Sequence, residues 1–475
     1  MLAAAAAVSL AIVAQDHTAL RAAPSGSAAT HAQLAAGDLV EVRGERLDFA
    51  QVYDHRRERA GFVRASQLRA VSTDAADAPG LLAVVRFLRD SPGAEAVGIA
   101  HVAAYLKAAP AKLIGSEPFD ALGVMAERLA RRASVADAGG KSASAAIDTV
   151  AQYGVRFASY ERQGAITLCY DGEAFRRVLA QQVAAPAHRA RAALALTRSD
   201  CIDPALPVRA RAEHNRWRAE VLDRVDDAAI ALLDEPTQQR LHARRASVWA
   251  TVAFERSRAG EAPQAAAQRA IQELAALNPR ELSDDDRALH TEAALRVGAV
   301  RWAALPAVSP SSRLTFSLRS GDEAGQTCVL LTDPARSDDA APLARRCTWG
   351  SAWLASARVA ADGKTAVLAV QPLDAWTELW VFRATRKGWV VDALPPAAAS
   401  DTGIGYIEFA GFVPHQPRLM VAREARVDGK SVRRFEVLRL DGSYVAERSA
   451  TSAQHLTAFV RWPDPAWRQG TVSLR

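Results

Sequence analysis

The chain has 475 residues, with a formal net charge of +6, 49% hydrophobic residues and 24% charged residues. Its arginines are interleaved with acidic residues along the expected helices and do not gather in one stripe, which argues against a nucleic-acid-binding protein. Beyond the N-terminal apolar run, no segment reaches the roughly 18 apolar residues of a membrane helix, so we expect no integral membrane segment. The length indicates about three domains.

Leu2–Ala14 is an uncharged apolar run followed by Gln15 and Asp16. It is too short to cross a bilayer, which takes about 20 residues, but has the length of a signal-peptide core. We therefore expect residues 1–15 to be a signal peptide cleaved near Ala14, and the protein to be periplasmic or secreted. The basic leader that such signals carry is missing, which leaves open a truncated start or a segment that is not a signal.

Residues 16–72 contain several short strand patterns. Gly37-Asp38 is a turn pair, and residues 39–42 alternate with the period of a strand. A polar hairpin tip at 55–59 separates a second strand from a third at 61–63. Strands this short, within so few residues, predict a small closed or nearly closed β-barrel.

The same segment resembles the bacterial Src-homology-3-like family between residues 19 and 68. The resemblance rests on Ala-Leu-Arg-Ala-Ala-Pro (19–24), Leu34, Gly37-Asp38, Val40, Val42, Ala-Gly-Phe-Val (60–63) and Ser66-x-Leu68. It implies an exported protein in which this module serves binding or targeting, often beside cell-wall enzymes.

Three aromatic residues are the candidate binding residues of this module: Phe49, Tyr53 and Phe62. The family usually has tryptophan where this chain has Phe49, and often where it has Phe62. These replacements keep an aromatic ring and lose the indole donor. For both phenylalanines the alternative is packing in the core, whereas Tyr53 could form a platform for a ligand.

Residues 80–305 are expected to be almost wholly helical, after a polar linker from Ser72 to Pro79. A helix is expected over Phe119–Arg132. The best-defined hairpin runs from Gln238 to Pro279, turns at Gly260–Pro263, and weakly resembles a tetratricopeptide-type unit. The pattern predicts either an irregular solenoid of helical hairpins, which would offer a concave binding surface, or a compact bundle.

Residues 313–475 change to the period of β-strands. A weak internal repeat, over 361–391 and again over 414–445, has the size of propeller blades of about 50 residues. Only about three such units fit, and closed propellers typically have four or more. Propeller-like repeats and a β-sandwich both stay open. Five tryptophans lie close together, either as core or as a sugar-stacking face: Trp349, Trp353, Trp376, Trp380 and Trp389.

The four cysteines fall into two regional pairs, Cys169 with Cys201 and Cys328 with Cys347. Two disulfides are the simplest arrangement and would require an oxidising compartment, in agreement with export. Four buried free thiols are the alternative. A zinc site is not expected, because no Cys-x-x-Cys or neighbouring histidine spacing occurs.

No recognisable catalytic motif is present, so an enzymatic role stays uncertain and is disfavoured, with no catalytic residue, metal or cofactor predicted. Asp284-Asp-Asp286 has the composition of a metal cluster. However, Ser283 with Asp286 three residues later has the spacing of a capping box, with aspartate in place of glutamate. We therefore interpret the run as a helix start.

The sequence predicts a multidomain α+β protein with an N-terminal β-barrel, a central all-α helical-hairpin region and a C-terminal all-β domain. The expected function is that of an exported, non-enzymatic envelope protein that binds or scaffolds. Its partner would be an envelope protein or a cell-wall polymer. A cell-wall hydrolase, or an activator of one, is the alternative, and a cytosolic scaffold is a lower one.

Overall fold

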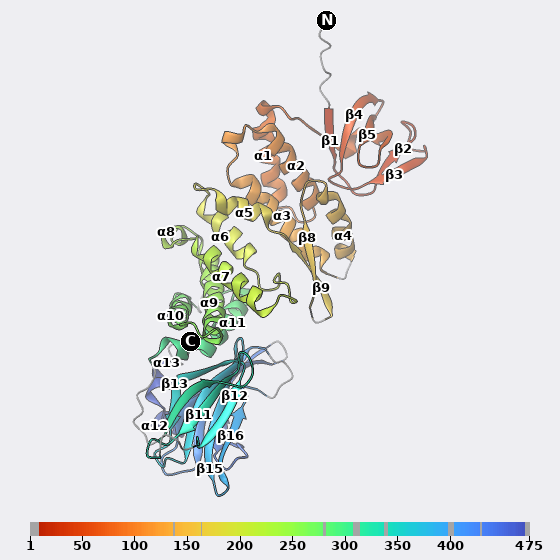
Figure 1. The fold of residues 1–475 in the computed structure, drawn as a ribbon. Coiled ribbons are helices and arrows are strands. Elements are labelled where there is room, and N and C mark those ends of the chain that lie inside the picture. Colours follow the sequence, from red (N-terminus) through yellow and green to blue (C-terminus); the bar gives the residue numbers. More distant parts are fainter. Residues whose placement is uncertain are drawn as a thin grey trace. The chain divides into compact units, whose positions relative to one another are not determined.

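In the computed structural model, the described residues are 9–135, 138–162, 164–278, 282–306, 314–336, 341–397, 403–427 and 430–470. They belong to two compact units. The first comprises Met1–Pro207 and Val221–Leu233, and the second comprises Val208–Glu220 and Asp234–Arg475. Figure 1 shows an N-terminal sheet, central helices and C-terminal strands, so the expected mixed α+β class is confirmed.

The first unit begins with a seven-stranded sheet whose order is β3-β2-β6-β5-β4-β1-β7. Its strands are β1 Ser9–Val13, β2 Thr18–Arg21, β3 Thr30–Leu34, β4 Leu39–Arg46, β5 Phe49–Asp54, β6 Arg59–Arg64 and β7 Leu68–Val71. The expected strands and turns are present, but β3 and β7 stay at opposite ends of this order. The sheet is therefore open, and the expected closed barrel is wrong.

Strand β1 overlaps the expected signal peptide over residues 1–15. It pairs with β4 on one side and with β7 on the other, and Ile12 and Val13 are completely buried. Cleavage near Ala14 would remove β1 from between these two strands. Among the described residues, the sheet begins at Ser9. An uncharged apolar run has the same composition in a signal-peptide core and in a buried strand, so composition alone does not distinguish the two.

The sheet shares a hydrophobic core with the first helices, α1 Ala78–Arg89 and α2 Glu95–Ala108. Ile12 packs there against Leu81 and Tyr105, among other residues of this core. The Tyr153 hydroxyl also donates to the carbonyl oxygen of Gly37 at 2.6 Å. The segment expected to be a linker contains a 3-10 turn and the first residues of α1. Sheet and helices therefore form one compact body.

The rest of the first unit is mainly helical. Its elements are α3 Glu117–Ala133, α4 Ala138–Ala151, β8 Phe157–Arg162, β9 Ala165–Tyr170, α5 Glu173–Ala180, α6 Pro186–Leu196 and α8 Asp227–Ile230. The helix expected over 119–132 is confirmed as part of α3. The β8–β9 hairpin was not expected; it turns at Gly164, whose φ of +77° suits glycine. A disulfide joins Cys169 of β9 to Cys201.

The second unit contains a helical hairpin of α9 Glu235–Arg258 and α10 Gln264–Ala275, packed with α11 Asp284–Val300. Helix α7 Val208–Asp223 crosses the boundary between the units. The hairpin expected over Gln238–Pro279 is confirmed in its described residues, with Gly260 at φ +73° in the turn. The helices of residues 80–305 are divided between the two units.

The C-terminal strands form a three-stranded sheet and an eight-stranded sheet. We divide the eight-stranded sheet into two antiparallel groups, which gives three groups in all. The first is β10 Thr315–Ser320, β11 Thr327–Thr332 and β12 Ala344–Thr348; the second is β13 Ser351–Val359, β14 Thr365–Leu373, β15 Trp376–Thr385 and β16 Gly388–Leu394; the third is β17 Gly405–Phe412, β18 Arg418–Val427, β19 Lys430–Arg439 and β20 Ala446–Ala450. Trp376 and Thr377 make a short parallel contact that joins the second group to the third. Cys328 and Cys347 form a disulfide across β11 and β12.

Three hydrophobic cores lie along these groups. One is shared by the first and second groups, another by the second and third, and the last by the third group and the short helices α12 Thr457–Arg461 and α13 Pro465–Gly470. Trp353, Trp376 and Trp380 are buried, as core packing requires, whereas Trp349 is exposed by half. The tryptophans therefore do not form one exposed stacking face.

Candidate functional site: an arginine–aromatic face of the N-terminal sheet

The three aromatic residues expected to bind lie on one face of the N-terminal sheet. In β5, Ala50 and Val52 belong to the interior of the sheet, so Phe49 and Tyr53 point to the opposite face. Directly opposed residues of neighbouring strands share a face. Phe62 of β6 lies opposite Gln51 of β5 and therefore belongs to the same outward face.

Arginines accompany each of these rings. The Arg43 guanidinium lies 4.1 Å from the centre of the Tyr53 ring, and that of Arg64 lies 5.3 Å from the centre of the Phe49 ring. Two more arginines occupy opposed positions on the same face, Arg21 across from Phe62 and Arg46 across from Phe49. We call this set the arginine–aromatic face: Arg21, Arg43, Arg46, Phe49, Tyr53, Phe62 and Arg64.

The rings differ in what they offer a ligand. Phe49 is only 3% exposed and fits the core-packing interpretation. Tyr53 and Phe62 are half-buried, so part of each ring faces solvent. The edge of the Tyr53 ring also meets His55, with ring centres 4.8 Å apart. Among the three expected binding residues, Tyr53 and Phe62 remain candidates for direct contact with a ligand.

The charge of this face is positive. Glu41 accepts hydrogen bonds from Arg43 at 3.0 Å and is paired with His55 at 2.7 Å, and these two partners hold the pKa of Glu41 below its usual value. Asp48 pairs with Arg64 at 2.8 Å. Exposed Arg46 has no ion-pair partner among the described residues. The face thus carries four arginines and only two carboxylates, and this excess of positive charge attracts anionic groups.

The turn beside this face holds an exposed apolar side chain in an unfavourable backbone conformation. Leu47 has a φ of +59° and is 87% exposed. A left-handed conformation costs a bulky residue roughly 1–2 kcal/mol. Strain of this kind is concentrated at functional sites in proteins. Leu47 follows Arg46 directly, so the turn extends the exposed surface of the face.

The second unit contains a partly buried polar network that joins helices to the β14–β15 turn. Asp374 of that turn pairs with Arg296 of α11 at 2.8 Å and accepts a hydrogen bond from Thr251 of α9 at 3.2 Å. Asn215 donates to Glu255 of α9 at 2.8 Å. Burial raises the pKa of Glu255 to about 7, with the charge of Asp374 adding to the rise. These contacts give the network a structural role.

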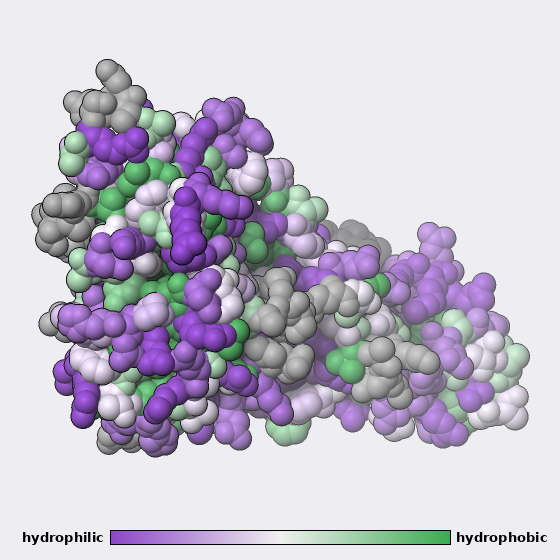
Figure 2. Space-filling view, turned by 90° about the horizontal axis from the view of Figure 1, so that it is seen from below, coloured by the Kyte–Doolittle hydropathy of each residue, from purple (hydrophilic) through white to green (hydrophobic). Residues whose placement is uncertain are grey.

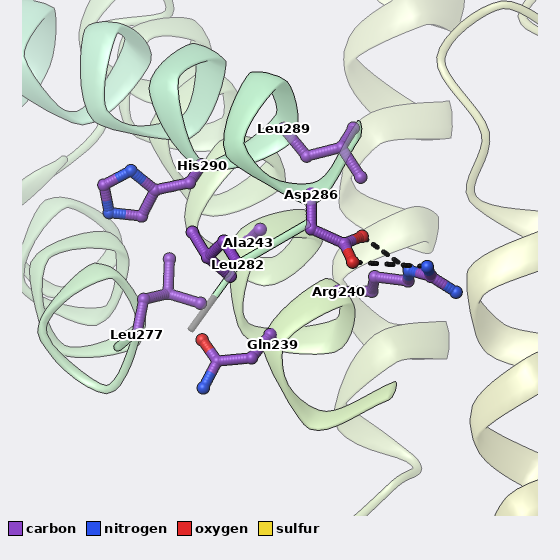
Figure 3. Close-up of a pocket in the computed structure, with 8 residues that line it drawn as sticks. All are labelled: Gln239, Arg240, Ala243, Leu277, Leu282, Asp286, Leu289 and His290. Atoms are coloured by element: carbon purple, nitrogen blue, oxygen red, sulfur yellow. Dashed lines mark hydrogen bonds and ion pairs between the residues drawn. The ribbon is translucent and has the colours of Figure 1, made fainter. Parts of the chain in front are cut away.

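Figure 3 shows a small depression between α9 and α11, lined by Gln239, Arg240, Ala243, Leu277, Leu282, Asp286, Leu289 and His290. It has no room for a molecule the size of water, so it is not a ligand site. The carboxylate of Asp286 is held by Arg240 at 2.6 Å. The Ser283 hydroxyl accepts from the Asp286 backbone N–H, which confirms the expected helix cap.

Several wider features of the described residues bear on function. Both expected cysteine pairs are disulfide-bonded, which fits an oxidising compartment and excludes the alternative of free thiols. In the part of the chain that the structure describes, no helix could span a bilayer, and no three potential metal ligands gather. On the side shown in Figure 2, hydrophilic residues surround smaller hydrophobic areas.

No protein-family model, curated protein or solved structure matches this chain. The arginine–aromatic face must therefore be judged on its own geometry. Sequence reasoning found its rings but missed its arginines. The signal was present, because Arg43 and Arg64 stand at alternating strand positions whose neighbours are apolar and inward-facing.

Proposed function

We propose that the protein is an exported binding or scaffold protein of the cell envelope that docks through the arginine–aromatic face. The observation that carries this proposal is the half-exposed Tyr53 ring beneath Arg43, on a sheet face with an excess of arginines. The two disulfides support export and disfavour the cytosolic alternative.

The finer architecture belongs to the same proposal. The N-terminal sheet is a Src-homology-3-like module, and the three C-terminal groups of strands are propeller-like units. Within each C-terminal group, strands that follow one another in the chain pair antiparallel, which supports the proposal of propeller-like units. The hydrophobic cores shared by successive groups also support the proposal. The helices of both units would add further binding surface.

The partner is an envelope protein or a cell-wall polymer. Arginine forks donate paired hydrogen bonds to carboxylates, and flat aromatic rings offer large apolar contact areas. A wall polymer that carries carboxylates on its peptides and apolar faces on its sugars would use both properties. Binding that depends on exposed arginines should also weaken as salt rises.

Co-sedimentation of the purified full chain with cell-wall sacculi tests the proposal. Deleting the module would be uninformative, because its residues share a core with α1 and α2. Point variants on the exposed face are therefore required. We expect Arg46→Ala combined with Tyr53→Ala to lower the affinity by roughly tenfold, as the loss of two exposed contacts predicts.

The matched control combines Arg156→Ala with Tyr160→Ala. Arg156 is exposed and Tyr160 is half-buried, and neither belongs to the N-terminal sheet of the same unit. This control should bind as the unaltered chain does. Equal binding by both double variants, or no binding by the unaltered chain, would contradict docking on the wall through this face.

A further inference from the structure

A serine and a histidine meet in the first unit where α3 packs against α6. The Ser116 hydroxyl lies 3.0 Å from Nδ1 of His188, although the two residues are 72 positions apart. Ser116 directly precedes α3, yet its side chain makes no capping hydrogen bond to that helix. The hydroxyl is directed at the imidazole instead.

A buried carboxylate lies on the other side of the imidazole. When the Ser116 hydroxyl donates to Nδ1, the ring proton is on Nε2. Nε2 lies 3.8 Å from an Asp120 oxygen, which also pairs with Arg191 at 2.5 Å. The second oxygen of Asp120 is buried and has no hydrogen-bond partner. A modest rotation of this carboxylate would bring the unpartnered oxygen to the Nε2–H of His188. That hydrogen bond would hold the ring proton on Nε2.

The pair lies close to the surface, with the histidine more exposed than the serine. Ser116 is 8% exposed and the His188 side chain 18%. The preceding residue, Gly115, is exposed and has open space where a side chain would stand. Arg86 of α1 lies nearby, paired with Glu117 at 2.5 Å and 60% exposed. Arg191 and Arg86 are each paired with a carboxylate, Asp120 and Glu117, so the charges around the pair are balanced.

We propose that Ser116 is a nucleophile and His188 its general base, in the hydrolysis of carboxylic esters. Asp120 acts as a positioning residue for the imidazole. The first backbone N–H groups of a helix have no acceptor within that helix. Glu117 is the residue directly after the serine, and serine hydrolases use the backbone N–H at this position to stabilise the oxyanion.

The proposed reaction needs only water as co-reactant. The serine oxygen attacks the ester carbonyl carbon while its proton passes to Nδ1 of His188. The tetrahedral adduct collapses, the C–O bond to the alcohol breaks, and the leaving oxygen takes the proton from Nδ1. Water then attacks the acyl-serine with the same base. The products are a carboxylic acid, an alcohol and the free serine.

Labelling with a fluorophosphonate probe tests this proposal in the full chain. The serine oxygen would displace fluoride from phosphorus, and peptide mass spectrometry would locate the adduct. We expect the adduct on Ser116, and no adduct there in Ser116→Ala. His188→Gln should slow labelling by roughly 10²- to 10⁴-fold, the usual contribution of a general base. Ser66→Ala, which removes an exposed serine in the 3-10 turn between β6 and β7, should label at the full rate.

A purely structural Ser116–His188 contact predicts a different result. The native chain would then label no faster than heat-denatured protein, or its adduct would map to another serine, and either outcome overturns the proposal. Circular dichroism and thermal unfolding of His188→Gln show whether its fold is intact. An intact fold with unchanged labelling of Ser116 would exclude His188 as the base. None of these outcomes depends on wall binding.

Discussion

Replacing Ile12 by alanine tests whether β1 belongs to the folded protein. Ile12 has no exposed surface, and it packs in the core that joins the N-terminal sheet to α1 and α2. Truncating a fully buried isoleucine to alanine costs about 2–5 kcal/mol, through lost burial and the cavity left behind. We expect a loss of about 3 kcal/mol in the first unit, because neighbours on both sheet and helices limit the collapse of the cavity.

Hydrogen exchange of the full chain is the suitable assay, since two units prevent a simple two-state analysis of global unfolding. The amides of β4 and β7 that pair with β1 should exchange roughly 100-fold faster in Ile12→Ala, as 1.4 kcal/mol corresponds to a factor of ten. Leu47→Ala removes an exposed side chain and should leave these rates unchanged. Unchanged exchange in Ile12→Ala, or a native N-terminus at Gln15, would refute the assignment of β1.

Two further predictions concern a buried carboxylate and a disulfide. Because burial raises the pKa of Glu255 from 4.5 to about 7, folding favours its protonated form, and the second unit should lose stability as pH rises from about 4.5 to 7. Glu255→Gln should remove up to about 3 kcal/mol of this dependence and be more stable at pH 8, measured by urea unfolding; an unchanged pH profile would contradict the buried acid. Replacing Cys169 and Cys201 by alanine should destabilise the first unit by about 3–4 kcal/mol, because the disulfide closes a loop between residues 32 positions apart. Unfolding at an unchanged temperature would show that this cross-link contributes little.

Local signals predicted much of this structure correctly. The cysteine pairing followed from regional spacing, and the cap at Ser283 followed from a serine three residues before an acidic side chain. The turn at Gly260 followed from glycine and proline between two periodic segments. The cap and the turn are determined by residues close in sequence, and the cysteine pairs lie within one region of the chain each, so tertiary packing does not need to be known.

Features that depend on distant partners were not predicted. Ser9–Val13 is a strand only because β4 and β7 flank it, and its apolar composition alone does not distinguish it from a signal-peptide core. Likewise, nothing local brings Ser116 to His188; the packing of α3 on α6 does so. The β8–β9 hairpin was missed because residues 157–170 lie between strongly helical segments and were assigned with them.

The two proposals about the first unit are coupled by its packing. The N-terminal sheet shares a core with α1 and α2, and residues of both helices also share a core with α3, the helix that follows Ser116. The distance between Ser116 and a polymer held on the arginine–aromatic face would therefore be limited. Such tethering raises the effective concentration of reactive groups without any additional contact. A sheet built into the helical core suits this role better than a module on a flexible linker, whose reach would vary.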